Sequence, residues 1–374
     1  MFRPVIQKTR FLVILASVNI LLFYWASQSI VVEKTGGYNE KVYAAEIMKT
    51  AMDTLRSHQL GSREVMMDDY TNDPNRTMLV GTQFSYITTD RGDLDAKLTT
   101  LNPNFAAMMV DLLMKAGVQT GDTIAVTVTG SMPGANIALY SACYAMDVTP
   151  VIISSVGASQ WGATSPYFTW IDMEKVLRHK QIFPYQSVAA SIGGGGDIGK
   201  GLTRKGKELL WEAIYRNELP LIQEDNLAKS IEKRMEIFSK TVPSFNYTAY
   251  LNVGGGAAAV GPSINAKLIP AGVSTPLELN KLLGKSVVRS FAKQNISVVH
   301  ILNIRELIEK YQLPIAPIPT PTPGEGTMFS TPMYNRWITA IALLLAVGLL
   351  AGTGYYSHQQ IRERMETYEP ESIL

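Results

Sequence analysis

Residues 123–154, with the sequence TIAVTVTGSMPGANIALYSACYAMDVTPVIIS, predict a β-α-β unit. Apolar and β-branched residues fill 123–129 and 150–154, which is typical of strands buried on both faces. Between them, residues 130–134 have the glycines and proline of a turn, and residues 135–146 have the length and composition of a helix. Two buried strands joined by a helix through short loops indicate a parallel sheet.

The alternation of strands and helices continues on both sides of this unit. Further strands are expected at residues 78–88, 187–192, 247–253 and 297–302. Helices are expected at residues 39–58, in a pair that ends at residue 116, and at 203–217, 224–239, 285–294 and 305–311. The predicted fold class is therefore α/β, with a mostly parallel sheet flanked by helices.

Two uncharged apolar segments lie near the ends of the chain, at residues 11–32 and 337–356. Each has the roughly 20 residues that a helix needs to cross a hydrocarbon core about 30 Å thick. A cleaved signal peptide is the alternative for the first segment, but its length exceeds the usual apolar core of about 7–15 residues. Basic residues precede the first segment and follow the second, so the positive-inside rule predicts that both termini are cytoplasmic.

This placement predicts a two-pass protein of the cell (inner) membrane whose middle part is extracytoplasmic. Five prolines between residues 314 and 323 predict an extended spacer between this part and the second membrane segment. The expected division is a cytoplasmic N-terminus (1–10), a transmembrane helix (11–32), an extracytoplasmic α/β domain (33–312), a proline-rich linker (313–336), a second transmembrane helix (337–356) and a cytoplasmic tail (357–374).

Composition excludes several classes of protein. The net charge is +2, hydrophobic residues make up 46% and charged residues 18%, which fits neither a disordered chain nor a nucleic-acid-binding protein. The single cysteine, Cys143, cannot form an intramolecular disulfide, and the four histidines are too scattered to predict a metal site. No cofactor is predicted.

Glycine-rich loops follow two of the expected strands. In parallel sheets ligands bind at the carboxyl ends of strands, and glycines let backbone N–H groups face an anion such as a carboxylate or phosphate. The candidate ligand-binding residues are Ser131 and Asn136 in the first turn, Gly193, Gly194, Gly195, Gly196, Asp197, Gly199 and Lys200 in one glycine loop, and Gly254, Gly255 and Gly256 in the other. The alternative is that these glycines serve only as tight structural turns.

The residues give no catalytic assignment. Residues 194–200 match the glycines and lysine of a phosphate-binding loop, but Gly201 occupies the position where Ser or Thr holds magnesium, which disfavours nucleotide hydrolysis. Ser131 is a conceivable nucleophile, but a helix-capping role is favoured because the sequence around it is not Gly-x-Ser-x-Gly. Asp197 is a conceivable acid or base with no evident partner in the sequence.

Three segments, TGSMPGAN (129–136), SIGGGGDIGKG (191–201) and NVGGG (252–256), together with the apolar ends, resemble the poly-gamma-glutamate system protein family. The resemblance covers most of the chain and implies a membrane accessory role in the synthesis, export or anchoring of poly-γ-glutamate as a capsule or exopolymer. The implied partners are poly-γ-glutamate or another anionic ligand, membrane-bound synthase components and the lipid bilayer, with no nucleic acid. The resemblance assigns no activity to single residues.

Two alternatives to a binding role stay open. One is an envelope hydrolase or transferase that acts on γ-glutamyl bonds, for which replacing Ser131 or Asp197 should abolish turnover. The other is a non-catalytic scaffold for the membrane synthase, with the two terminal helices as the contact surface. A binding role is favoured over catalysis.

Overall fold

The computed structural model describes residues 8–61 and 71–367 of the 374-residue chain. The chain divides into two compact units. One unit combines the two ends, Met1–Lys34 and Ser330–Leu374, and the other is the continuous segment Thr35–Phe329. The larger unit contains the predicted α/β domain.

A seven-stranded sheet forms the centre of the larger unit, in the order β7-β6-β4-β3-β8-β10-β9. Every neighbouring pair is parallel except β10 and β9, which are antiparallel. The strands are β3 (Thr123–Thr129), β4 (Thr149–Ser155), β6 (Ala189–Ser191), β7 (Leu221–Ile222), β8 (Ala249–Val253), β9 (Gly272–Ser274) and β10 (Ser297–Ile301). The predicted α/β class with a mostly parallel sheet is confirmed.

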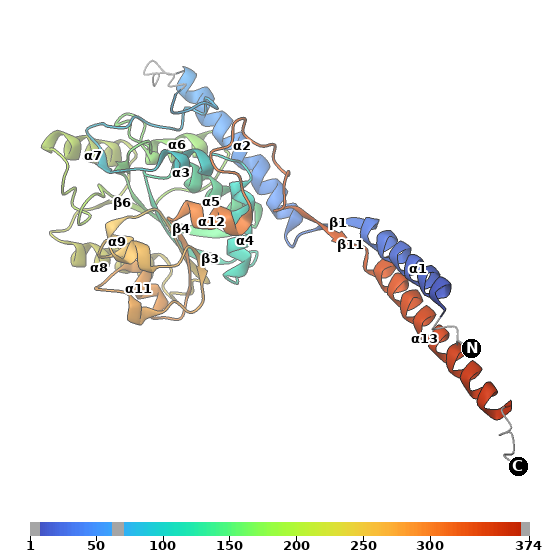
Figure 1. Cartoon of the computed structure of the whole chain (residues 1–374). Coiled ribbons are helices and arrows are strands. Elements are labelled where there is room, and N and C mark those ends of the chain that lie inside the picture. The colour runs from blue at the N-terminus through green and yellow to red at the C-terminus, as the bar shows by residue number, and fades with distance from the viewer. Residues whose placement is uncertain (1–7, 62–70, 368–374) are drawn as a thin grey trace, which may run out of the picture. The chain divides into compact units, whose positions relative to one another are not determined.

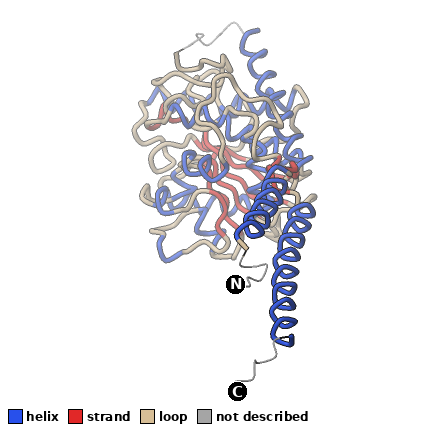
Figure 2. Tube along the Cα trace, turned by 45° about the vertical axis from the view of Figure 1, so that its right-hand side comes forward, coloured by secondary structure: helices blue, strands red, loops and turns tan. Residues whose placement is uncertain are grey.

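Helices cover both faces of this sheet (Figures 1 and 2). One hydrophobic core holds side chains of α2 (Tyr38–Gly61), α3 (Leu94–Thr100), α4 (Phe105–Lys115), α5 (Pro133–Ala145), α6 (Trp170–His179), α7 (Arg204–Arg216) and α12 (Ile304–Tyr311). A second core holds side chains of α8 (Leu227–Thr241), α9 (Ala257–Val260) and α11 (Val287–Ala292). The short segments α10 (Asn265–Leu268) and η2 (Leu279–Lys281) lie between α9 and α11 in the chain. Val126 and Ala125, neighbours on β3, belong to different cores, as expected for a strand buried on both faces.

The path of the chain places a switch point beside β3. From β3 the chain runs through β4 and β6 to β7, then returns to β8 on the other side of β3 and continues through the edge strand β9 to β10. The loops that follow β3 and β8 therefore lead in opposite directions. Such a point, at the carboxyl ends of the strands, is where open parallel sheets bind ligands.

The prediction of a strand at residues 78–88 was wrong for most of this range. The structure has only β2 (Thr88–Asp90), which pairs with the two-residue strand β5 (Ala158–Ser159) outside the main sheet. Met78 has a positive φ of 57°, which interrupts an extended backbone. At Gly81 an added Cβ would lie 2.1 Å from the carbonyl oxygen of Gly162. This segment is therefore an irregular coil that packs closely against the loop around Gly162.

The proline-rich residues also differ from expectation, because they lie on the domain rather than in a free spacer. The Asn75 side chain donates to the carbonyl of Pro317 at 2.8 Å, and the Ala316 N–H donates to the Thr99 hydroxyl at 2.9 Å. The Asn104 side chain accepts from the Gly324 N–H at 3.1 Å. These side chains satisfy backbone groups that a proline-rich coil cannot pair with itself, and the larger unit accordingly runs to Phe329.

The smaller unit contains α1 (Thr9–Gln28) and α13 (Arg336–Thr367), joined to the strands β1 (Ile30–Lys34) and β11 (Ser330–Tyr334). Both helices are long and apolar enough to cross a membrane. They lie side by side (Figure 1). α13 continues past the predicted end at residue 356, and the last residues of the first predicted membrane segment belong to β1 rather than to a helix.

Candidate functional site

The glycine loop after β6 uses most of its own N–H groups. The N–H groups of Asp197, Gly199 and Lys200 donate to the carbonyls of Gly194, Gly193 and Gly195 at 3.0, 2.8 and 3.1 Å. Positive φ angles at Gly193, Gly194, Gly196 and Gly199 allow this tight path. The loop is therefore internally hydrogen-bonded, with the Lys200 side chain exposed on its outside.

Asp197 belongs to this loop, and its side chain is part of a buried polar network. Its carboxylate is 2.9 Å from the Arg234 guanidinium of α8, and both side chains are only 1% exposed. Three serine hydroxyls complete the network: Ser191 donates to Asp197 at 2.7 Å, Ser230 at 2.5 Å and Ser155 at 3.5 Å. Because Ser155 ends β4 and Ser191 ends β6, the network joins two strand ends to α8. A carboxylate paired in this way connects these strand ends to α8. Because it is already engaged by Arg234 and the three serines, it is not available as a catalytic acid or base.

The second glycine loop closes against the same edge. A Cβ added at Gly254 would lie 2.2 Å from the Thr129 hydroxyl, and one at Gly256 would lie 3.2 Å from the Thr129 methyl group. Gly256 also lies near the Ser155 hydroxyl, with 3.8 Å between that oxygen and the position of a Cβ. The structure thus brings the ends of β3, β4, β6 and β8 together, and glycine is required for this close packing rather than only for binding.

Ser131 and Asn136 hold the loop between β3 and α5. The Ser131 hydroxyl accepts from the Ser159 N–H at 2.9 Å, so it ties this loop to β5. The Asn136 side chain is fully buried and donates to the carbonyl of Thr129 at 2.9 Å. Asn136 therefore caps the end of β3, while Ser131 remains partly exposed.

Lys97, which the sequence analysis did not single out, is the most unusual ionisable group near this loop. It is 3% exposed, and its ammonium nitrogen contacts the Ser131 carbonyl and lies 2.8 Å from the Ser159 hydroxyl. Burial lowers the pKa of Lys97 to about 7, although the nearby Asp93 carboxylate opposes this shift. Lys97 shares a helical face with Leu94, Leu98 and Leu101. A lysine within an apolar stripe is therefore the sequence feature from which its burial could have been predicted.

A second buried network crosses three strands in one row. Thr127, Asn252 and His300 are register partners on β3, β8 and β10. The Asn252 amide donates to the Gly254 carbonyl at 2.7 Å and to Nδ1 of His300 at 3.0 Å, while its oxygen accepts from Thr127 at 2.9 Å. Burial lowers the pKa of His300 to about 4, so the ring is neutral at physiological pH.

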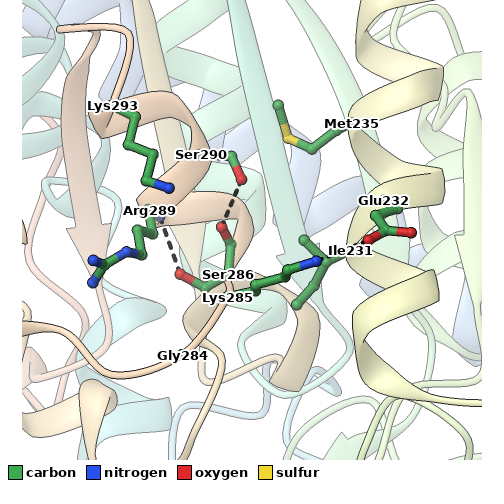
Figure 3. Close-up of a pocket in the computed structure, with 9 residues that line it drawn as sticks. All are labelled: Ile231, Glu232, Met235, Gly284, Lys285, Ser286, Arg289, Ser290 and Lys293. Carbon is green, nitrogen blue, oxygen red and sulfur yellow. Dashed lines mark hydrogen bonds and ion pairs between the residues drawn. The ribbon is translucent and has the colours of Figure 1, made fainter.

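A cavity of about 340 Å³ opens between α8 and α11 (Figure 3). We call it the α8–α11 groove; its lining residues are Ile231, Glu232, Met235, Gly284, Lys285, Ser286, Arg289, Ser290 and Lys293. Lys285 pairs with Glu232 at 3.0 Å, and the Arg289 guanidinium donates to the carbonyls of Leu279 and Leu282 at 2.8 and 2.5 Å. Three cations against one carboxylate give the groove a positive charge beside the apolar side chains of Ile231 and Met235.

A second hollow of about 350 Å³ lies at the far end of the glycine loop. It is lined by Phe84, Ser85, Tyr86, Thr88, Gly201, Leu202 and Thr203. Thr203 caps α7 by accepting from the Gly206 N–H at 3.1 Å, and the rings of Phe84 and Tyr86 are exposed. This hollow is aromatic rather than basic, so an anion is better matched by the α8–α11 groove.

Comparison of the chain with protein-family models, with curated proteins and with solved structures gives no match. Among the residues that the structure describes, no group of three or more His, Cys, Asp or Glu side chains is placed to hold a metal ion.

Proposed function

We propose that this chain is a membrane-anchored accessory protein that binds poly-γ-glutamate during its synthesis, export or anchoring. In this proposal α1 and α13 cross the cell membrane, both termini are cytoplasmic and the α/β domain is on the outer side. The observation that carries the proposal is the α8–α11 groove, where cations border an apolar surface. A γ-linked glutamate chain has the matching chemistry, since each repeat offers one carboxylate on a short methylene chain.

The spacing of the cations supports an extended polyanion. Arg289 and Lys293 are four residues apart along α11 and its C-cap, which places their Cβ atoms about 5–6 Å apart. A γ-glutamyl repeat contributes five backbone bonds; because three such bonds span about 3.3–3.6 Å, one repeat extends about 6 Å. The carboxylates of the polymer therefore repeat at about the spacing at which these two basic side chains leave the helix. Each exposed contact is worth only about 0–1 kcal/mol, so affinity requires several repeats.

The Lys293→Ala variant is expected to weaken binding of a fluorescent poly-γ-glutamate oligomer about two- to fivefold, measured by anisotropy with the full chain in nanodiscs. Binding should also weaken as salt is raised from low to moderate concentration, because the contacts are exposed charges. Lys49→Ala, which removes an exposed cation of α2, is the matched control and should leave affinity unchanged.

Lys200→Ala separates the groove from the glycine loop. Unchanged binding in this variant together with weaker binding in Lys293→Ala supports the groove. Loss of binding in Lys200→Ala alone would assign the ligand to the glycine loop instead. Absence of any saturable binding by the unaltered chain would overturn the proposal and favour a scaffold for the synthase.

A second candidate function is hydrolysis or transfer at γ-glutamyl bonds, and the contact between Lys97 and Ser159 favours it over chemistry at Ser131 or Asp197. In this mechanism neutral Lys97 takes the proton of the Ser159 hydroxyl as its oxygen attacks the amide carbonyl. Lys97 then returns that proton to the departing amine, and water releases the acyl group from Ser159. Asp197 takes no part, because its carboxylate is already paired with Arg234.

Release of nitroaniline from γ-glutamyl-p-nitroanilide tests this second function. The rate is expected to rise as pH passes through about 7, because Lys97 acts as a base only when neutral. Turnover should be lost in Ser159→Ala and Lys97→Met and kept in Ser131→Ala, which removes one hydrogen bond to the Ser159 N–H. Turnover that survives in Ser159→Ala, or no turnover by the unaltered chain, would exclude this mechanism.

A further inference from the structure

The two strands of the smaller unit form an isolated ribbon, which we call the β1–β11 ribbon. It pairs Ile30–Lys34 antiparallel with Ser330–Tyr334, and no third strand joins it within residues 8–61 and 71–367. The three pairs next to the helices are apolar: Ile30 with Tyr334, Val31 with Met333 and Val32 with Pro332. The two pairs farther from the helices, Glu33 with Thr331 and Lys34 with Ser330, are polar.

The apolar residues of this ribbon are exposed on both of its faces. Successive residues of a strand point to opposite faces, yet Ile30, Val31 and Val32 are 57%, 47% and 66% exposed. A ribbon with one face on a hydrophobic core would instead alternate apolar and polar residues. Isolated two-stranded ribbons are also only marginally stable in water. Both facts indicate that the surroundings of these three pairs are not bulk water.

The ribbon continues directly from the two apolar helices. α1 ends at Gln28 and α13 begins at Arg336, and the Asn335 N–H donates to the Ser29 carbonyl at 2.7 Å, where the helices meet the ribbon. The 20 residues of α1 already span about 30 Å, the thickness of the hydrocarbon core. The three apolar pairs cover about 10 Å more, which is comparable with the headgroup layer of about 5–8 Å on each side.

Arg336 also indicates where the apolar part of the ribbon ends. It lies at the helix end of the ribbon, but its guanidinium is 3.8 Å from the Glu33 carboxylate, beyond the three apolar pairs. Long basic side chains reach in this way from an apolar layer to water. Trp337 beside it is 81% exposed, as expected for an aromatic anchor at a membrane surface.

We propose that the first three pairs of the β1–β11 ribbon are immersed in the interfacial layer of the bilayer, and that the boundary with water lies between Val32 and Glu33; this rests on the proposed crossing of the membrane by α1 and α13. The occupant of both apolar faces is lipid at the level of the headgroups and the first acyl carbons. The outer edges of the ribbon carry backbone groups that need hydrogen bonds. Headgroups and interfacial water supply these bonds, whereas the hydrocarbon core cannot, which limits the depth of immersion.

The test compares a polarity-sensitive bimane label at two positions of the full chain that lie two residues apart on one face of β1. Val32→Cys and Lys34→Cys are made in a Cys143→Ala background, since Cys143 is the single cysteine and is buried. In nanodiscs that hold one chain each, the label at position 32 is expected to emit at shorter wavelength and to be protected from aqueous iodide. The label at position 34 should be quenched several times more strongly.

Equal quenching at positions 32 and 34 would overturn the proposal. Protection of position 32 that appears only when several chains share a disc would also overturn it, in favour of a second copy of the chain paired on the ribbon. A label at Trp337→Cys is the internal reference for a buried interfacial position, and a label at Lys49→Cys is the reference for water. These readouts do not depend on the ligand of the α/β domain.

Discussion

Replacing Arg234 with methionine is expected to lower the free energy of unfolding of the chain by about 3–5 kcal/mol. The guanidinium is 1% exposed and holds Asp197 at 2.9 Å, Ser191 at 2.7 Å and Ser155 at 3.1 Å. Methionine fills similar volume but leaves the Asp197 charge buried without its cation. Most of the expected loss is therefore the cost of an unpaired buried carboxylate, measured by urea unfolding of the nanodisc-bound chain through its tryptophan fluorescence.

Lys233→Met is the matched control for this change. Lys233 is next to Arg234 on α8, but its ion pair with Glu236 is exposed, so its removal should change the free energy of unfolding by less than about 0.5 kcal/mol. Adding Asp197→Leu to Arg234→Met should recover part of the loss, because it removes the unpaired charge. A single Arg234→Met variant as stable as Lys233→Met would contradict the assignment of this network as the element that holds the sheet edge.

The central elements could be predicted from the sequence because their signals are local. The apolar runs of β3 and β4 and the turn between β3 and α5 fix the β-α-β unit without reference to the rest of the chain. β7 and β9 are two and three residues long, too short for a periodic pattern, and they exist only because neighbouring strands offer them hydrogen bonds. The strand predicted at residues 78–88 was wrong for a different reason. The apolar residues of this segment do pack in the core, but they do so from an irregular coil, which the hydrophobic pattern alone does not distinguish from a strand.

The candidate site was predicted less well, because its pairings join distant parts of the chain. Asp197 and Arg234 are 37 residues apart, and Thr127 and Asn252 are 125 apart. A local signal was nevertheless present at Arg234, which shares a helical stripe with Ile231 and Phe238, as Lys97 does with its leucines. A charged residue on an apolar stripe predicts a buried partner, but only the fold identifies that partner.

Acid is expected to destabilise the chain through His300, whose folded pKa is about 4 against about 6.5 in the unfolded chain. As pH falls below 6.5 the unfolded state takes up a proton that the folded state does not, so the free energy of unfolding decreases. The decrease continues to about pH 4, below which both states are protonated. One pKa unit corresponds to 1.36 kcal/mol, so the full effect is about 3 kcal/mol, most of which is lost by pH 4.5.

Burial is the cause of the lowered pKa, and the surroundings of the ring offer no acceptor for a second proton. Nδ1 of His300 accepts from the Asn252 amide, whose orientation is fixed because the same NH2 group donates to the Gly254 carbonyl. The remaining nitrogen, Nε2, therefore carries the hydrogen, and it has no hydrogen-bond partner among the described residues. Protonation at Nδ1 would turn an accepted hydrogen bond into a clash of two donors and would place a charge within the sheet.

His300→Gln should keep an acceptor for Asn252 and remove the titration. Urea unfolding at pH 7 and pH 4.5 is expected to show that this variant loses about 2–3 kcal/mol less between the two pH values than the unaltered chain does. Carboxylates titrate in both proteins, so the difference between the two pH dependences isolates the histidine. His179→Gln, at the exposed end of α6, is the control for replacing a histidine with glutamine. Parallel pH dependences for His300→Gln and the unaltered chain would mean that the folded protein accommodates the imidazolium, and that the row of Thr127, Asn252 and His300 opens to water in acid.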